Sequence, residues 1–209
     1  MDIAIVIYDR FTALDAIGPY EVLSRVPGAR VRFVAARAGQ VSTDNGMLRI
    51  EAETAVSEVA APEIVLVPGG PGEVAARAGG DVLEWLAEVA PKCAWTTSVC
   101  TGSLILAAAG LLDGRRATTH WLAMDELARL GAVAVSERVV FDGDVVTAAG
   151  VSAGIDMALS LAARLAGDEV AQAIQLGIEY EPKPPFKAGH PDTAPAAIVE
   201  ALRSRSRFA

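Results

Sequence analysis

Two short segments rich in β-branched residues end abruptly in glycine-containing turns, and this feature restricts the fold more than any other. Ile64–Val67 is fully apolar and runs directly into Pro68-Gly69-Gly70-Pro71-Gly72. Ala94–Val99 runs in the same way into Cys100-Thr101-Gly102. Runs this short, rich in β-branched residues and bounded by turn residues, are typical of strands inside a sheet that is covered on both faces. We therefore expect an α/β fold with a mostly parallel central sheet and helices on both of its sides.

Strand-like and helix-like segments alternate along most of the chain, as such a fold requires. Asn45-Gly46 indicates a β-hairpin between Gln40–Ser42 and Met47–Ile50. The other predicted strands are Ile3–Tyr8, Val31–Ala36, Val133–Val135, Arg138–Phe141 and Val145–Ala148, the last two joined by a turn at Asp142-Gly143. The predicted helices are a segment from about Pro19 to Val26, Asp81–Val89, Gly102–Ala109, His120–Leu130, a segment from Ser152 or Ala153 to Leu165, and one from Asp168 to about Tyr180.

The chain is expected to form one domain. Its 209 residues contain no internal repeat and no recognisable interdomain linker, so residues 1–209 are assigned to a single domain. Glu181–Pro195 contains five of the eleven prolines and is predicted to be an extended tail on the surface.

The net charge and the two cysteines disfavour several classes of partner and location. With 18 basic and 26 acidic residues, the net charge of −8 disfavours nucleic acid as a partner. Membrane binding is also disfavoured, because no segment approaches the roughly 20 apolar residues of a membrane span. The two cysteines do not form a disulfide framework, and no signal peptide is recognised at the N-terminus. We expect a reducing, cytoplasmic location.

Cys100 is the strongest candidate for a catalytic residue. A strand ends just before it, a helix begins just after it, and Ser98 and Gly102 on either side are small. This follows the logic of a nucleophile elbow, the sharp strand-to-helix turn that exposes a catalytic nucleophile. The positive end of the helix dipole is expected to lower the pKa of the thiol. The alternative is a small buried cysteine that only packs, which is the interpretation we give to Cys93.

The glycine-rich turn after Ile64–Val67 is the second candidate. Its backbone N–H groups, those of Gly69 and Gly70 in particular, are predicted to bind substrate or to line an oxyanion hole together with the N–H groups of Cys100 and Thr101. A phosphate-binding loop is the competing interpretation, but the Gly-Lys-Ser/Thr ending of that motif is absent. A simple tight loop is the third.

Asp15 and His120 complete the set of candidate residues. Asp15 lies between apolar neighbours just past the first predicted strand, where open α/β sheets bind ligands, and is either a proton donor or an ordinary helix N-cap. His120 either lines the pocket or packs in the core, whereas His190 is expected at the surface. Two histidines without clustered ligands make a zinc site improbable, and no cofactor is expected.

Taken together, these residues resemble the DJ-1/PfpI superfamily over nearly the whole chain, and within it most closely the isonitrile hydratase branch. The resemblance rests on Leu14-Asp15, Gly18-Pro19, Pro68-Gly69-Gly70, Thr97 through Leu104, Arg116 through Trp121, Ala153 through Asp156, and the tail from Pro184 to Pro195. It implies a flavodoxin-like sandwich, commonly a homodimer, in which Cys100 sits on the elbow. The implied activity is the cofactor-independent hydration of an isonitrile to an N-substituted formamide. In that reaction Cys100 adds to the isonitrile carbon, Asp15 transfers protons, and Thr101 and Gly70 orient the pocket.

One departure and two alternatives bear on this resemblance. Peptidase and glyoxalase-like members of the superfamily place histidine directly after the nucleophile, where this chain has Thr101. A redox- or stress-sensing protein that uses the same thiol without turnover is one alternative. A ligand-sensing domain related to AraC-type regulators is the other, although the chain ends at Ala209 without the C-terminal helix-turn-helix region of those regulators.

Overall fold

A computed structural model describes residues 1–208, and within them the main sheet has seven strands. Their order is β10-β11-β7-β6-β1-β2-β5. All neighbouring strands are parallel except β10, which pairs with β11 in the antiparallel direction. The strands are β1 (Asp2–Val6), β2 (Arg30–Ala35), β5 (Thr54–Ala55), β6 (Ile64–Val67), β7 (Trp95–Val99), β10 (Val139–Asp142) and β11 (Val145–Ala148). The expected mostly parallel, flavodoxin-like sheet is confirmed.

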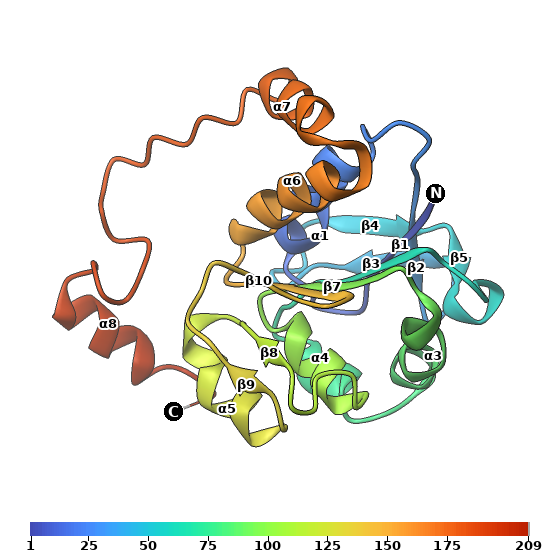
Figure 1. The fold of residues 1–209 in the computed structure, drawn as a ribbon. Helices are drawn as coiled ribbons and strands as arrows, with labels where there is room; N and C mark the ends of the chain where they lie inside the picture. The colour runs from blue at the N-terminus through green and yellow to red at the C-terminus, as the bar shows by residue number, and fades with distance from the viewer. Residues whose placement is uncertain (209) are drawn as a thin grey trace.

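Helices cover both faces of this sheet (Figure 1). One face carries α1 (Ala13–Leu23), α6 (Ala153–Ala166) and α7 (Asp168–Gly177), with α6 packed between the other two. The opposite face carries α4 (Gly102–Ala108), which contacts α2 (Glu73–Ala76), α3 (Asp81–Val89) and α5 (Met124–Arg129). None of the helices within residues 1–208 combines the length and the apolar character needed to cross a bilayer.

Smaller elements lie outside the main sheet. The predicted hairpin is present as β3 (Gly39–Ser42) and β4 (Arg49–Ala52), and β8 (Arg116–Ala117) pairs with β9 (Val133–Ala134). Three short 3₁₀ helices are described, η1 (Val56–Glu58), η2 (Ala90–Lys92) and η3 (Trp121–Ala123).

Two glycines let α1 and α6 pack closely enough to hold the residues around the elbow. A Cβ at Gly154 would lie 3.0 Å from Val99 Cγ2 and 3.1 Å from Pro19 Cγ, and one at Gly18 would lie 3.0 Å from Ile155 Cγ1. These contacts leave little room for a larger side chain. The start of α6 is therefore fixed against both α1 and the end of β7.

Several predicted boundaries were wrong for local reasons. Helix α1 begins at Ala13 rather than Pro19. The prediction started the helix at Pro19 because proline usually occupies the first turn of a helix, but here Pro19 lies inside it. The predicted helix from His120 is split into η3 and α5, and the β10–β11 turn is Gly143-Asp144 because Asp142 pairs with Val145. Helix α7 ends at Gly177, before Tyr180.

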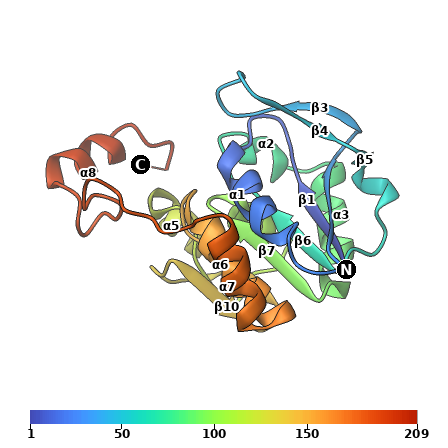
Figure 2. The ribbon, with the colours of Figure 1, turned by 90° about the horizontal axis from the view of Figure 1, so that it is seen from above.

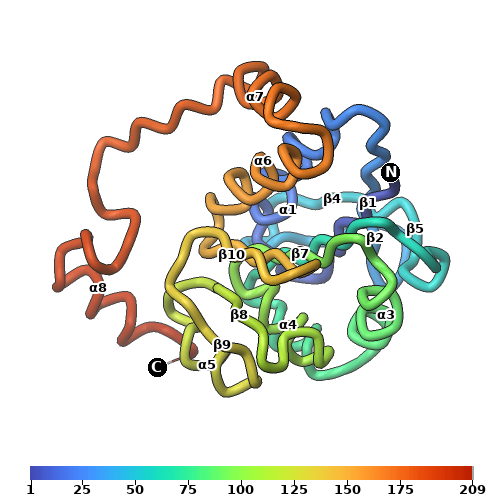
Figure 3. The backbone as a smooth tube through the Cα atoms, viewed as in Figure 1, coloured from blue at the N-terminus to red at the C-terminus, as the bar shows by residue number. Residues whose placement is uncertain are grey.

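The chain leaves the sandwich after α7 and returns to it at its end. Residues 178–195 contain no helix or strand and are mostly exposed, as predicted for the proline-rich tail. The tail leads into α8 (Ala196–Arg203), a helix that the sequence analysis did not anticipate. The backbone trace shows α8 standing apart from the sandwich, on the side of α5 (Figure 3). The view from above shows the same separation (Figure 2).

Candidate active site

The candidate residues come together at the carboxyl ends of three neighbouring strands. Asp15 follows β1, Gly69 and Gly70 follow β6, and Cys100 with Thr101 follows β7. In the sheet, β2 lies on one side of β1 and β6 lies on the other, so the strand order reverses its direction next to β1. The carboxyl ends of these strands therefore form the topological switch point of the sheet. Open α/β sheets bind their ligands at this position.

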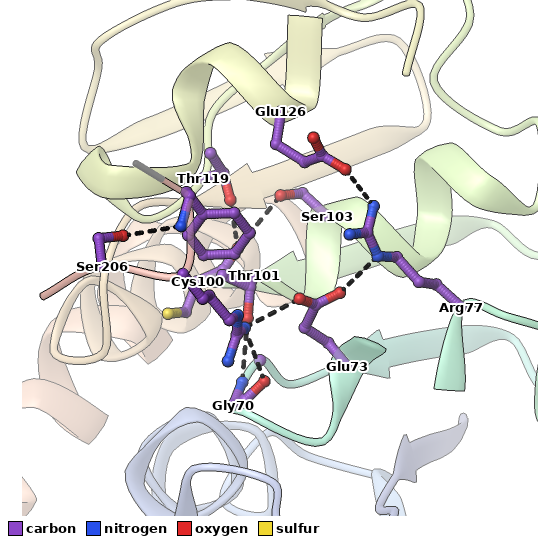
Figure 4. Close-up of polar contacts among 12 residues, drawn as sticks. Gly70, Glu73, Arg77, Cys100, Thr101, Ser103, Thr119, Glu126 and Ser206 are labelled. Carbon is purple, nitrogen blue, oxygen red and sulfur yellow. Dashed lines mark hydrogen bonds and ion pairs between the residues drawn. The ribbon is translucent and has the colours of Figure 1, made fainter. Parts of the chain in front are cut away.

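The backbone of Cys100 is strained and held from several directions. Its φ of +57° lies in the left-handed region that a residue with a side chain seldom adopts. Its N–H donates to the carbonyls of Ala148 and Ala149, both at 3.0 Å. Its carbonyl accepts from Ser103 Oγ at 3.1 Å and Thr119 Oγ1 at 3.0 Å (Figure 4). A strained conformation persists only where its surroundings fix it, and such residues cluster at active sites.

Two glycines next to the elbow permit its close contacts. A Cβ at Gly102 would lie 2.1 Å from the Val67 carbonyl oxygen, so the first residue of α4 must be glycine to sit against the end of β6. A Cβ at Gly69 would lie 2.5 Å from the Thr101 nitrogen. The loop after β6 and the loop after β7 therefore contact each other at glycines, where no side chain separates their backbones.

The Cys100 thiol is buried, and its pKa is raised rather than lowered. The side chain is 6% exposed, and burial is the main cause of the raised pKa, with the nearby charge of Asp15 second. The N–H groups of Val151 and Thr101 donate to the sulfur and act in the opposite direction. The sequence-based expectation of a lowered pKa was wrong, because desolvation outweighs these donors. The resting thiol therefore keeps its proton at neutral pH.

Asp15 is a buried carboxyl next to that thiol. Its side chain is fully buried, and Oδ2 accepts the Gly69 N–H at 2.9 Å, whereas Oδ1 has no hydrogen-bond partner within residues 1–208. Burial raises its pKa to about 7, against the lowering effects of the Gly69 N–H and the Cys100 thiol. Thr12, not Asp15, holds the N-cap position of α1. The helix-cap alternative is therefore wrong, and the carboxyl is poised to gain or lose a proton near neutral pH.

The N–H groups of Gly69 and Gly70 have partners other than those predicted. Gly69 donates to Asp15, and Gly70 donates to Thr101 Oγ1 at 3.0 Å (Figure 4). Neither is a free donor of an oxyanion hole in this structure. Their contacts instead fix the orientation of the Asp15 carboxyl and the Thr101 hydroxyl.

His120 borders a cavity beside the elbow. Its Nδ1 accepts the Leu122 N–H at 3.3 Å, and burial, followed by the charge of Arg207, lowers its pKa. The ring is therefore neutral at pH 7, with its proton on Nε2. Residues Thr119 and Val151, which contact Cys100, line the same cavity of about 400 Å³. Among the two histidines, His120 faces the candidate site and His190 lies in the exposed tail.

The sequence analysis missed three residues of this site. Val151 supplies one of the two N–H donors to sulfur from the turn after β11, where its φ is +33°. The signal that could have identified Val151 in the sequence was its position just after β11, the strand next to β7. Glu73 is fully buried beneath the glycine turn and pairs with Arg77 Nε at 2.9 Å (Figure 4). It also pairs with Arg207 Nη2 at 2.8 Å. No local pattern marked Arg207, which lies 134 residues away from Glu73 in sequence.

Within residues 1–208, no group of three or more histidine, cysteine or acidic side chains is arranged as a metal site. The chemistry available from the described side chains is that of a thiol, a carboxyl group that titrates near neutral pH, a hydroxyl and a neutral imidazole. This combination suits addition of sulfur to an electrophilic carbon with proton transfer.

Comparison with known proteins relates the chain to one family. Residues 1–164 match the model of the DJ-1/PfpI family. The isonitrile hydratase of Pseudomonas putida is 42% identical over 206 residues, covering 99% of this chain and 90% of that protein. A ThiJ/PfpI family protein of Pseudomonas syringae superimposes with a TM-score of 0.94 at 38% identity, covering 97% of this chain and 84% of the other. The transcriptional regulator CdhR of Pseudomonas aeruginosa is 31% identical over 76% of this chain and 48% of its own length.

Proposed function

The chain belongs to the DJ-1/PfpI family, and on that premise we propose that it is an isonitrile hydratase, which converts an isonitrile and water into an N-substituted formamide. The family also includes members without catalytic activity, so membership alone does not select the reaction. The observation that carries the proposal is the pairing of the Cys100 thiol with the Asp15 carboxyl, whose pKa is about 7. The similarity to the Pseudomonas putida enzyme along almost the full chain supports the same reaction.

The first half of the proposed reaction forms a thioimidate. The thiol of Cys100 loses its proton to Asp15, and the carboxyl delivers a proton to the terminal carbon of R–N≡C. Sulfur bonds to that carbon as these protons move, giving R–N=CH–S–Cys100 with no net change in protons. The Val151 and Thr101 N–H groups stabilise the negative charge that develops on sulfur. Because the resting pKa of the thiol is high, ionisation accompanies the addition instead of preceding it.

The second half releases the product. Asp15, again a carboxylate, takes a proton from water as the oxygen attacks the thioimidate carbon. Transfer of that proton to nitrogen gives a tetrahedral adduct, R–NH–CH(OH)–S–Cys100. Cleavage of the carbon–sulfur bond returns the hydroxyl proton through Asp15 to the thiol and leaves R–NH–CHO. His120 lines the cavity of about 400 Å³, and its Nε2–H is the group that we propose to contact the substrate or the product oxygen.

Thr101 and the glycine turn act in this scheme by orientation. The Gly70 N–H holds the Thr101 hydroxyl, and the Gly69 N–H holds the Asp15 carboxyl. The proposal also includes a single domain over residues 1–209, a homodimeric assembly and a cytoplasmic location. Light scattering of the purified protein measures the assembly state, and a monomer at micromolar concentration would contradict that part of the proposal.

The direct test is conversion of cyclohexyl isocyanide to N-cyclohexylformamide, followed by mass spectrometry. Wild-type protein and Cys93→Ala should turn over, whereas Cys100→Ala and Asp15→Asn should not. Acid quenching during turnover should leave Cys100 heavier by one isonitrile. Absence of turnover in the wild type, or undiminished turnover by Cys100→Ala, would contradict the proposal.

The same samples separate the alternatives. A redox sensor would show Cys100 oxidised to sulfinic acid under mild peroxide and no conversion of the isonitrile. A ligand-sensing domain, the role suggested by the similarity to half of CdhR, would be stabilised by a metabolite that it does not consume.

A further inference from the structure

The end of the chain returns to the candidate active site. Arg207 Nη2 donates to the Gly70 carbonyl oxygen at 3.3 Å and to Glu73 Oε1 at 2.8 Å. Gly70 belongs to the turn that orients Asp15 and Thr101. One guanidinium thus bridges a backbone carbonyl of that turn and the buried carboxylate beneath it, which a planar group with several donors is suited to do.

The charge of Arg207 is felt inside the site. It lowers the pKa of His120, after burial as the main cause. It also opposes the raised pKa of Tyr8, whose hydroxyl donates to the Pro68 carbonyl at 2.7 Å, immediately before the glycine turn. These two effects agree with the contacts of the guanidinium with Gly70 and Glu73, although Arg207 lies 107 residues beyond Cys100 in sequence.

Phe208 lines the larger of two adjacent cavities. Its ring packs against the core of the sandwich, and the Arg207 guanidinium carbon is 4.7 Å from the ring centroid. Phe208 lines an outer cavity of about 740 Å³, next to the inner cavity of about 400 Å³ beside the elbow. Trp121, Met124 and His190 line both cavities, so the two are adjacent. An N-substituent too large for the inner cavity would extend into the outer one, which Phe208 lines.

We propose that Arg207 is a positioning residue and Phe208 a specificity-determining residue of this active site, supplied by the far end of the chain. The inference rests on the proposed hydratase function for its substrate. Arg207 holds the Gly69–Gly70 turn, and Phe208 with Trp121 and Met124 forms an apolar wall for the N-substituent. Phe208 therefore limits the size of the N-substituent that the site accepts.

The first experiment measures access to the Cys100 thiol and does not depend on turnover. Alkylation of the full-length protein by iodoacetamide and by the bulkier N-phenylmaleimide is followed by peptide mass mapping, which separates Cys100 from Cys93. Phe208→Ala should accelerate the maleimide reaction at Cys100 about tenfold, the effect that one steric contact in an apolar pocket supplies. The iodoacetamide rate should change much less. Arg205→Ala is the matched control, because Arg205 is exposed and makes no hydrogen bond or ion pair among the described residues.

The second experiment measures selectivity and positioning. Phe208→Ala should change the KM ratio between benzyl and isopropyl isocyanide by about tenfold relative to wild type and to the Arg205→Ala control. Arg207→Ala should lower kcat and raise the pKa of His120 measured by NMR, and Arg207→Lys should keep that pKa low. Equal alkylation rates and an unchanged KM ratio in Phe208→Ala would overturn the assignment of Phe208. An unchanged kcat and an unmoved His120 pKa in Arg207→Ala would overturn that of Arg207.

The two experiments distinguish a failure of the proposed hydratase function from a failure of the present inference. If no variant or wild type converts isonitriles but Phe208→Ala still opens access to Cys100, the hydratase function is wrong and the placement of the C-terminal segment at the pocket is retained. If the wild type turns over and neither variant departs from Arg205→Ala, the function stands and the present inference is wrong.

Discussion

The two cysteines at opposite ends of β7 show which part of the environment makes a thiol a candidate nucleophile. Cys93 precedes the strand and Cys100 follows it. Both are buried, at 8% and 6% exposure, and burial raises the pKa of both thiols. Burial therefore does not distinguish them.

Backbone and neighbours do distinguish them. Cys93 has an ordinary extended conformation, with φ of −73°, and its thiol donates to the Val89 carbonyl at 3.3 Å. Cys100 is strained, receives two N–H donors at sulfur, and faces a carboxyl with a pKa of about 7. The difference teaches that reactivity here comes from donors and a proton acceptor arranged around the sulfur, not from a low resting pKa.

The largest expected effect tests that comparison directly. Cys100→Ala should lower turnover of cyclohexyl isocyanide by at least about 10³-fold, because it removes the covalent intermediate. Cys93→Ala should leave kcat/KM within about twofold, since Cys93 lies at the opposite end of the strand. Steady-state rates of formamide formation measure both. Equal losses of turnover in the two variants would mean that the different surroundings of Cys93 and Cys100 do not determine catalysis.

The next effect concerns the proton acceptor that Cys93 lacks. Asp15→Asn should reduce kcat by about 10²–10⁴-fold, the range that general acid–base catalysis supplies. The variant should nevertheless fold more stably at pH 8, because it removes a buried carboxylate. The rise of its pKa from 3.8 to about 7 corresponds to at most about 4 kcal/mol.

The pH dependence of that stability difference has a definite sign. A carboxyl whose folded pKa is raised stabilises the protein below its unfolded pKa and loses this contribution as the pH rises through the folded value. Wild type and Asp15→Asn should therefore match near pH 4, diverge in favour of Asp15→Asn up to pH 7, and differ by a constant amount above it. Urea unfolding at several pH values measures this. A difference that shrinks with rising pH would contradict a raised pKa for Asp15.

A smaller effect is expected at the hydroxyl next to the nucleophile. Thr101→Val removes the acceptor of the Gly70 N–H, and an unsatisfied buried donor costs about 1–3 kcal/mol. Thr101→Ser keeps the hydroxyl and should keep most of the stability and rate. Thermal unfolding and kcat for the pair separate the hydrogen bond from the volume of the side chain. Equal behaviour of the valine and serine variants would remove the proposed orienting role of Thr101.

The sequence was sufficient for the features that depend on local pattern. β6 and β11 have the predicted bounds, and the elbow at Cys100 follows from a strand, small neighbours and a helix placed in immediate succession. Asp15 could be placed near Cys100 because the carboxyl ends of parallel strands share one edge. The hairpin at Asn45-Gly46 followed from its turn residues alone.

The features that were missed depend on the balance of burial or on contacts between distant segments. The sign of the Cys100 pKa shift required knowing that desolvation exceeds the effect of the N–H donors. The partners of the Gly69 and Gly70 N–H groups depend on where β1 and β7 place their following residues. The return of Arg207 to Glu73 requires the path of the whole tail, which no local pattern encodes.

The smallest effect concerns Cys93 and sharpens the comparison from the structural side. Cys93→Ala should cost about 1 kcal/mol at pH 7, from the lost hydrogen bond to the Val89 carbonyl and the lost sulfur contacts. Burial raises the pKa of this thiol from 9.0 to about 11, so the folded protein keeps a proton that the unfolded chain has lost in that interval. The wild type then loses stability as the pH rises from 9 to 11, and the cost of Cys93→Ala should shrink there. Urea midpoints of the two proteins at pH 7, 9 and 10.5 measure this effect. A cost that grows with pH would require a stabilised thiolate at Cys93 and would contradict its raised pKa.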